Sequence, residues 1–230
     1  MSNGTADGAR WIEVSPERLA GWLDSFAQQH GDVVITPEPA VVTFRAKDGA
    51  AAECHVPFPP LQRSADEAAD DVAGSAERIS AHARAPRTVG VLLVRLGGYA
   101  AGVFTGPDAR LAASKVGSRL VHGRSAAGGT SQHRFARRRE KQASEALGAA
   151  ADTAAAVFGP YAGKLDAVVL GGDRRAIAGL RDDPRLRPYL ELAVDRFLTV
   201  PDPRLAVLRT APRQFRAIRV RLTEPAPPAA

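Results

Sequence analysis

Residues 88–105, TVGVLLVRLGGYAAGVFT, set the fold of the larger part of this chain. The first run, residues 88–95, is apolar almost throughout and has the length of a buried strand. Gly97-Gly98 then marks a hairpin turn into a second apolar run, residues 99–105. A turn containing glycine and proline leads on to a third run, residues 110–116. The pattern predicts a three-stranded antiparallel meander.

Helices and strands alternate after this meander. The first element is a long helix over residues 131–158, with an expected packing stripe of Phe135, Ala143, Ala146, Leu147, Ala150, Ala154, Val157 and Phe158. The following elements are expected to be a strand at 165–170, a short helix capped by Asp173, a strand at 197–200, a helix across 203–208 and a strand at 215–222. This order resembles a ribonuclease H-like arrangement. We therefore expect an α/β (α+β) fold with a mixed sheet.

The remaining residues divide the chain further. Residues 1–57 predict a small α/β N-terminal module, in which Ser15 and Pro16 begin a helix between short strands. Residues 58–85 are rich in proline and then acidic, and we expect a linker with one marginal helix. The second domain is expected to cover residues 86–223, followed by a disordered tail over 224–230.

The composition is that of an ordinary globular protein, with 45% hydrophobic and 24% charged residues. No apolar run approaches the roughly 20 residues of a membrane span, and the N-terminal residues lack a signal-peptide core. The single cysteine, Cys54, excludes an internal disulfide and fits a reducing compartment. These features predict a cytoplasmic protein without a membrane partner. The net charge of +6 favours polyanions as partners.

The positive charge is concentrated at one place. Residues 122–142, HGRSAAGGTSQHRFARRREKQ, combine a loop of small residues with a strongly basic helix start. One helical face carries Arg134, Arg137, Arg138 and Lys141, with Arg139 on its flank and Arg124 upstream. Like charges at this spacing repel, and cations near a helix N-terminus oppose the helix dipole. An external polyanion would explain the arrangement, and a solvated helix face is the alternative.

Gln132 stands between the small-residue loop and this basic helix. Its side chain carries both a hydrogen-bond acceptor and a donor without a charge, which suits it to orienting a water molecule against an ester. Its backbone N–H could also stabilise an oxyanion. Taken alone, Gln132 fits an ordinary residue at a helix start equally well.

The order of these motifs resembles a known family. HGR, a Gly-Gly/Gln loop and RFARRR are similar to the catalytic domain of eukaryotic and archaeal class I peptide-release factors. The longer loop, Gly128-Gly129-Thr130-Ser131-Gln132, resembles the Vms-like release factors (the VLRF domain), more closely their bacterial branch. The resemblance covers roughly residues 86–222 and includes VGVLLVRLGGYAAGVF, ASKVGSR, LDAVVLGGDR and VPDPRLAVLRTAPRQFRAIRVRL.

This resemblance implies a codon-independent peptidyl-tRNA hydrolase that frees nascent chains from obstructed ribosomal complexes. Gln132 would be the catalytic residue, Gly128, Gly129, Thr130 and Ser131 would form the catalytic loop, and the basic residues of the helix would contact rRNA or tRNA. The implied partners are peptidyl-tRNA and the peptidyl-transferase centre of the large ribosomal subunit. No cofactor and no metal is implied.

Other functions remain open at this point. A ribosome-binding hibernation or protection factor would occupy the same centre without hydrolysis, and an RNA-binding adaptor would not need the loop. A two-metal nuclease requires clustered carboxylates, whereas the first strand of the meander carries none. Ser131 and His133 flank Gln132 without an identifiable acidic partner, which disfavours a serine hydrolase. Cys54 and His55 are neighbours in a predicted strand, so their side chains should face opposite sides.

Overall fold

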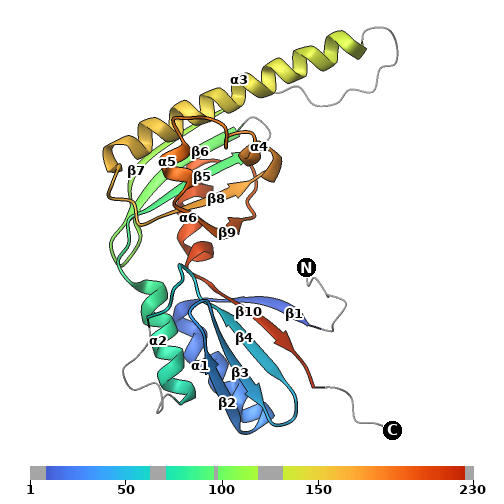
Figure 1. Cartoon of the computed structure of the whole chain (residues 1–230), viewed down its shortest axis with the longest axis vertical. Coiled ribbons are helices and arrows are strands. Elements are labelled where there is room, and N and C mark those ends of the chain that lie inside the picture. Colours follow the sequence, from blue (N-terminus) through green and yellow to red (C-terminus); the bar gives the residue numbers. More distant parts are fainter. Residues whose placement is uncertain (1–8, 63–70, 96–97, 119–131, 226–230) are drawn as a thin grey trace. The chain divides into compact units, whose positions relative to one another are not determined.

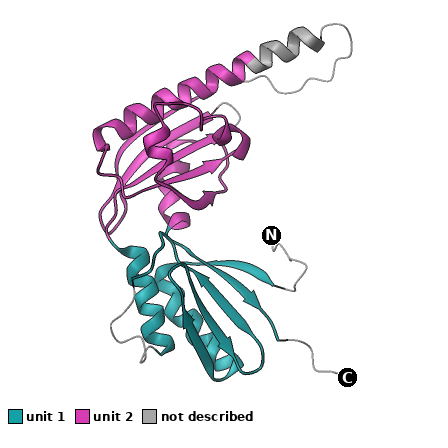
Figure 2. Cartoon of the chain, viewed as in Figure 1, with its two compact units in different colours: residues 1–85, 216–230 teal, residues 86–215 magenta. Residues whose placement is uncertain are grey.

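The computed structural model describes residues 9–62, 71–95, 98–118 and 132–225, and the side chains of residues 132–140 are outside the description. The chain forms two compact units with a mixed α/β architecture. Unit 1 consists of residues 1–85 together with 216–230, and unit 2 consists of residues 86–215 (Figure 2). Each unit contains a five-stranded sheet of its own.

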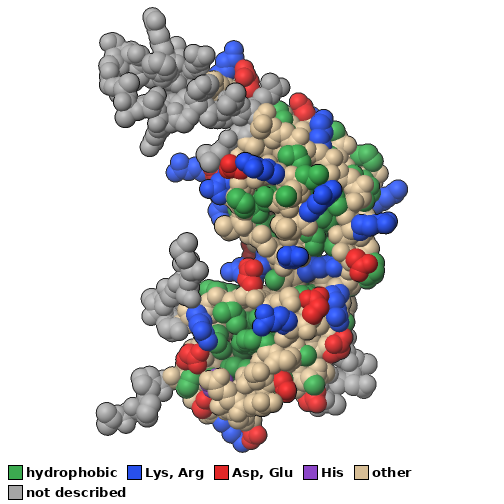
Figure 3. All heavy atoms as spheres, turned by 180° about the vertical axis from the view of Figure 1, so that it is seen from behind, with side chains coloured by type: hydrophobic (Ala, Val, Ile, Leu, Met, Phe, Trp, Pro, Cys, Tyr) green, Lys and Arg blue, Asp and Glu red, His purple; other side chains and the backbone are tan. Residues whose placement is uncertain are grey.

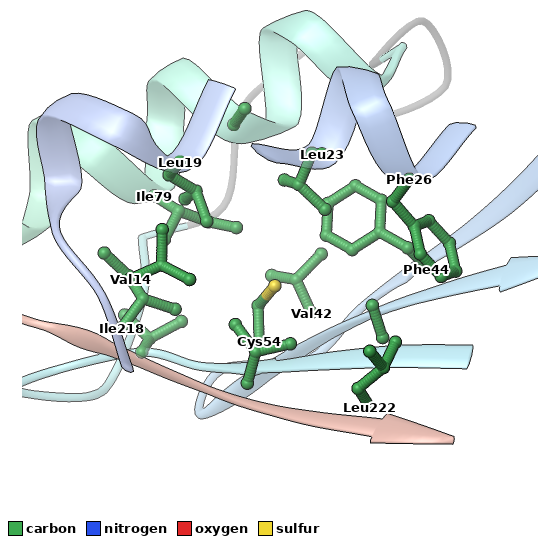
Figure 4. Close-up of a cluster of buried hydrophobic side chains, with 14 of the residues drawn as sticks. Val14, Leu19, Leu23, Phe26, Val42, Phe44, Cys54, Ile79, Ile218 and Leu222 are labelled. Atoms are coloured by element: carbon green, nitrogen blue, oxygen red, sulfur yellow. The ribbon is translucent and has the colours of Figure 1, made fainter. Parts of the chain in front are cut away.

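Unit 1 contains an antiparallel sheet in the order β1-β10-β4-β3-β2 (Figure 1). Its elements are β1 (Arg10–Val14), α1 (Pro16–His30), β2 (Val33–Pro37), β3 (Val41–Ala46), β4 (Ala51–His55), α2 (Val72–Arg84) and β10 (Ile218–Thr223). Alternate residues of these strands point toward the two helices, as Val42, Cys54 and Leu222 do in Figure 4. The sheet is therefore apolar on one face, which is how a half-covered antiparallel sheet is built.

Helix α1 follows the sequence signals closely. Pro16 occupies its first turn, where the missing N–H costs nothing, and the next turns bury Leu19, Leu23 and Phe26. The helix ends at Gly31, whose φ of 82° suits a glycine. Ser15 is the N-cap residue, as expected, although its side chain makes no capping hydrogen bond.

A helix is present where one was predicted within residues 58–85, but α2 belongs to the core of unit 1 and not to a linker. Asp71 caps it by accepting a 2.7 Å hydrogen bond from the backbone N–H of Gly74. Ile79 and Ala83 are buried in the core of unit 1, and the Ser80 hydroxyl donates to the Pro16 carbonyl of α1 at 2.8 Å. The acidic, alanine-rich composition did not predict this packing, because alanines form no clear hydrophobic stripe. In the structure their small side chains allow the two helices to pack closely.

Unit 2 contains a mixed sheet in the order β7-β6-β5-β8-β9. Its elements are β5 (Val89–Arg95), β6 (Gly98–Thr105), β7 (Arg110–Ser118), α3 (Gln132–Phe158), a 3-10 turn (Gly159–Tyr161), β8 (Ala167–Gly172), α4 (Arg174–Ala178), α5 (Arg187–Leu190), β9 (Ala193–Leu198) and α6 (Leu205–Phe215). The predicted meander is present, because β5, β6 and β7 pair antiparallel in that order. Strand β8 joins the other side of β5 in parallel, and β9 follows it.

Helices cover both faces of this second sheet. Tyr99, Ala101 and Val103 of β6 belong to the hydrophobic cluster that α3 completes. On the opposite face, the ring of Phe104 lies 5.8 Å from that of Phe215 in α6. Burial from both sides explains why residues 89–94 of β5 are all buried and read as a continuous apolar run.

The last strand corrects one prediction. Residues 215–222 were expected to complete the second domain, whereas β10 lies in unit 1 between β1 and β4. The pairs Val220–Ile12 and Val220–Cys54 fix its register on the two sides. Its alternating pattern, with Ile218, Val220 and Leu222 buried, suits a sheet covered on one face only. An alternating strand pattern does not reveal which of two sheets a strand will join.

Candidate functional site

The predicted site lies between the end of β7 at Ser118 and the start of α3 at Gln132. Gln132 is the first residue of α3. Arg124, Gly128, Gly129, Thr130 and Ser131 lie outside the described residues, as do the side chains of Arg134, Arg137, Arg138 and Arg139. The described structure therefore shows how the site is attached to unit 2.

The C-terminal half of α3 anchors the site. Ala146, Ala150, Ala154, Val157 and Phe158 are all buried, and the helix packs against β5, β6 and β7. Their burial confirms these positions of the predicted stripe. The small alanine side chains let the helix lie close to the sheet. A β-carbon on Gly90 would come within 3.2 Å of the Phe158 ring, which shows how tight this packing is.

One member of the predicted stripe, Ala143, does not contribute to this anchor. Ala143 is exposed, and the side chain of Phe135 lies outside the description. Among the described side chains of the helix, Ala146 is therefore the first that is buried, and residues 132–145 before it cover about 21 Å at 1.5 Å per residue. Helix α3 extends past the edge of the sheet in this direction (Figure 1). Gln132 consequently stands at the far end of a helix that is fixed at its other end.

Lys141 is the member of the predicted basic face whose side chain is described. It is 79% exposed, and its ammonium nitrogen lies 4.0 Å from a carboxylate oxygen of Glu145, one turn later. Such an exposed pair contributes at most about 0.5 kcal/mol, so it would not prevent Lys141 from pairing with another anion. Lys and Arg side chains are also present elsewhere on both units, with acidic groups among them (Figure 3).

A tyrosine–glycine contact lies where the chain leaves the sheet toward the site. Tyr99 of β6 is paired with Gly117 of β7, one residue before that strand ends. A β-carbon on Gly117 would lie 2.5 Å from the Tyr99 hydroxyl oxygen, so only glycine lets the ring lie across the strand. Neither residue was predicted to belong to the site. A glycine opposite an aromatic residue in neighbouring strands is the signal that would have revealed it.

Two carboxylates of unit 2, Asp166 and Asp173, have structural partners. Asp166 accepts a 2.6 Å hydrogen bond from the backbone N–H of Thr88, and Asp173 caps α4 by accepting one of 2.8 Å from that of Arg175. The predicted capping role of Asp173 is confirmed. Among the described residues, no group of three or more His, Cys, Asp and Glu side chains lies close enough to bind a metal ion.

Cys54 and His55 face opposite sides of their strand, as predicted. Cys54 lies in the core beneath α1 and α2, and burial raises the pKa of its thiol to about 12. His55 lies on the other face, where its ring centroid is 4.9 Å from that of Trp11. The two side chains therefore cannot form a nucleophile–base pair.

The family of the chain follows from its sequence. Residues 87–221, more than half of the chain, match the family described as "Actinobacteria/chloroflexi VLRF1 release factor". The chain belongs to this family. The VLRF1 match begins just before β5 and includes α3 and the predicted loop, and it ends within β10. No curated protein matches the chain.

Several solved structures are similar to this VLRF1 family member. The archaeal translation termination factor aRF1 shares 15% identity, with 90% of this chain and 64% of that chain covered and a TM-score of 0.43. The Vms1 mitochondrial localization core shares 12% identity over 82% of this chain and 77% of that one, with a TM-score of 0.38. For Pelota from Archaeoglobus fulgidus the identity is 12%, the coverages are 94% and 66%, and the TM-score is 0.31. The chain thus spans less than two thirds of the length of aRF1.

No helix in the described part of the chain is both long and apolar enough to cross a membrane.

Proposed function

We propose that this protein is a codon-independent peptidyl-tRNA hydrolase, which frees nascent chains from obstructed ribosomal complexes in the cytoplasm. The observation that carries the proposal is the position of Gln132. It follows the Gly-Gly-containing loop of a VLRF1 family member and begins a helix of 27 residues, in which Ala146 is the first buried residue among the described side chains. Such a helix would bring the loop to a distant ester while the sheet of unit 2 stays outside the peptidyl-transferase centre.

In this proposal water attacks the ester that joins the nascent chain to the tRNA 3′ ribose. The bond to the 3′ oxygen then breaks, a proton from the water passes to that oxygen, and the nascent chain leaves as a carboxylate. The Gln132 side chain orients the water through its carbonyl oxygen, and its backbone N–H donates to the oxyanion of the tetrahedral intermediate. Gly128, Gly129, Thr130 and Ser131 leave room for the loop to adopt the shape that the peptidyl-transferase centre requires. Metal ions and cofactors have no part in this mechanism.

Basic residues on α3 and before it supply the binding energy in the same proposal. Arg124, Arg134, Arg137, Arg138, Arg139 and Lys141 would pair with phosphates of rRNA or tRNA, and the exposure of Lys141 supports this role. The strand order β7-β6-β5-β8-β9 supports a ribonuclease H-like classification of unit 2 as the catalytic domain. The N-terminal module of unit 1 has no assigned part in the chemistry.

The decisive test is release of labelled peptide from peptidyl-tRNA in stalled ribosomal complexes with an empty A site. Gln132→Ala should slow release by about 10²-fold, the lower end of the cost of losing one oxyanion donor, because its backbone N–H remains. Gln142→Ala is the matched control, since it removes the same side chain from the same helix, ten residues after Gln132 and beyond RFARRR. Undiminished release by Gln132→Ala would move the chemistry to another residue. Tight binding without release by the wild-type protein would instead support the hibernation or protection factor.

A further inference from the structure

Unit 2 has a hollow at the carboxyl end of β8, with a volume of about 500 Å³. Its apolar floor is made by Leu170 of β8, Ile177 of α4 and Leu190 at the end of α5. In Figure 1, α4 follows the arrowhead of β8 in unit 2. The volume lies within the range of about 300–1,000 Å³ that is typical of small-molecule sites.

An irregularity of the edge strand β9 forms one wall of this hollow. The register pairs Val168 with Ala193 and then Leu170 with Phe197, so a single residue of β8 faces three residues of β9, 194–196. Strand bulges of this kind redirect side chains and are frequent beside functional sites. Here the bulge brings Val194 and Asp195 into the lining of the hollow.

The rim carries an arginine stacked on an aromatic ring. The guanidinium carbon of Arg174 lies 4.2 Å from the centroid of the Phe197 ring, and both residues line the hollow. A guanidinium placed over an aromatic ring can stack with a further planar group, such as a nucleobase, on its other side. Arg181 adds a second exposed guanidinium to the rim, opposed by one carboxylate, that of Asp195. The lining therefore combines apolar, aromatic and positively charged side chains with one carboxylate.

We propose that this hollow binds a nucleotide. The base stacks on the layer formed by Arg174 and Phe197, its edge lies over the apolar floor, and the phosphate pairs with Arg181. The Asp195 carboxylate accepts hydrogen bonds from the amino group of guanine, adenine or cytosine. Uracil has no amino group. Its N–H is flanked by two carbonyl oxygens, which a carboxylate repels. The site therefore prefers an amine-bearing base.

The same chemistry is offered by a free mononucleotide and by an unstacked nucleotide within an RNA strand. The proposal rests on the lining of the hollow alone and is independent of the loop and of peptide release. Failure of one proposal therefore leaves the other untouched, because nucleotide binding and peptide release are separate measurements.

The test is a titration of the full-length protein, followed by the amide chemical shifts of the lining residues, with GMP, UMP, guanosine and inorganic phosphate as separate ligands. GMP should bind saturably with shifts at the lining residues. Arg174→Ala and Arg181→Ala should each weaken binding by about tenfold, which corresponds to about 1.4 kcal/mol. Arg175→Ala is the matched control, because Arg175 is an exposed arginine of α4 outside the lining and should leave binding unchanged. Asp195→Asn should reduce the preference for GMP over UMP.

Several outcomes would overturn this proposal. The first is the absence of saturable shifts at the lining residues. The second is a loss of GMP affinity with Arg175→Ala equal to that with Arg174→Ala or Arg181→Ala. The third is binding of inorganic phosphate as tight as that of GMP. A short single-stranded RNA in a parallel titration separates the two sources. Tighter binding of the RNA than of GMP at the same residues identifies a strand as the ligand, and the reverse identifies a free nucleotide. The shift map of the wild-type protein decides the matter even if a variant fails to fold.

Discussion

At Gly172, at the end of β8, only a residue without a side chain fits the backbone. Its φ is 100°, and a β-carbon there would overlap the backbone carbonyl of Val94 in the neighbouring strand. That carbonyl also accepts a 2.8 Å hydrogen bond from the N–H of Asp173, so the two strands are held close at this point. The Gly171-Gly172-Asp173 run is thus explained by packing and capping in unit 2.

Gly172→Ala should therefore destabilise unit 2 by about 2–4 kcal/mol, through strain at φ and displacement of β5. Gly148→Ala provides the control, because it lies inside α3 with no atom within 4 Å of the added carbon. That change should raise stability by about 0.5–1 kcal/mol, since alanine favours the helix. Chemical denaturation followed by far-UV circular dichroism compares the two. Equal effects of the two substitutions would contradict the strain argument.

The charge state of His55 links the stability of unit 1 to pH. Burial lowers the pKa of His55 below its ordinary value of 6.5, Arg219 and Arg221 lower it further, and Glu53 partly opposes them. The unfolded chain therefore binds a proton at His55 more readily than the folded chain does. The contribution of neutral His55 to stability is fully present above pH 6.5 and is lost as the pH is lowered through 6.5 toward the folded-state pKa.

His55→Phe should flatten this pH dependence, because the ring against Trp11 is kept and the titrating group is removed. Both tryptophans of the chain, Trp11 and Trp22, lie in unit 1, so their fluorescence follows unfolding of that unit. Urea midpoints at pH 7.5 and 5.5 should differ less in the variant than in the wild type. An unchanged difference would assign the effect to other groups.

Among the elements, α3 shows most clearly what a sequence pattern can and cannot predict. The 3.6-residue period correctly identified Ala146, Ala150, Ala154 and Val157 as packed positions. It also included Ala143, which is exposed, because an alanine is compatible with either environment. The point where packing ends depends on the width of the sheet below, and that width is set by strands elsewhere in the chain.

In the proposed function, the arginines of α3 bind the ribosome through phosphate groups of its RNA. Arg134→Glu, Arg137→Glu and Arg138→Glu in one variant should weaken ribosome binding, most strongly at low salt. The slope of log K against log salt concentration should become shallower by about 2–3, because each phosphate contact contributes roughly 0.7–0.9. The control variant reverses three exposed arginines on other elements, Arg18, Arg110 and Arg209, for the same change in net charge. Equal losses in both variants would indicate a general effect of charge.

At the scale of the whole molecule, unit 1 is built from two separate parts of the chain. Strand β10 follows unit 2 in the sequence, yet it lies in the sheet of unit 1 between β1 and β4. The VLRF1 match ends at residue 221, within this strand. The family region therefore supplies a structural part of the module that precedes it.

Removal of residues 216–230 should unfold unit 1 and leave unit 2 folded. The truncated sheet would lose the strand that joins β1 to β4, and β1 would have no neighbour. Tryptophan fluorescence should show unit 1 exposed to solvent, while limited proteolysis should still yield a protected fragment near residues 86–215. Cleavage throughout both units would show that unit 2 needs unit 1 for its stability.

The sequence was sufficient to predict most helices and strands, but it was insufficient to predict how they assemble into two units. The strands at 10–14 and 89–95 and the helix starting at Pro16 follow from local signals, since turns, caps and periodicity act over a few residues. The place of β10 and the packing of α2 against α1 depend on contacts between residues far apart in the chain. For the predicted site, the sequence provided Gln132 and its basic neighbours, whereas the anchoring of α3 and the Tyr99–Gly117 contact required the structure.

The position of β10 also has a consequence for biosynthesis. A ribosome adds about 5–20 residues per second, and N-terminal parts of a chain usually fold first. Here the N-terminal sheet has to wait until all of unit 2 has been translated, because its connecting strand emerges afterwards. During that interval β1 and β4 present unpaired backbone edges, which are prone to aggregation. A copy whose translation stops before β10 keeps those edges permanently, and it becomes a natural substrate for chaperones and proteases.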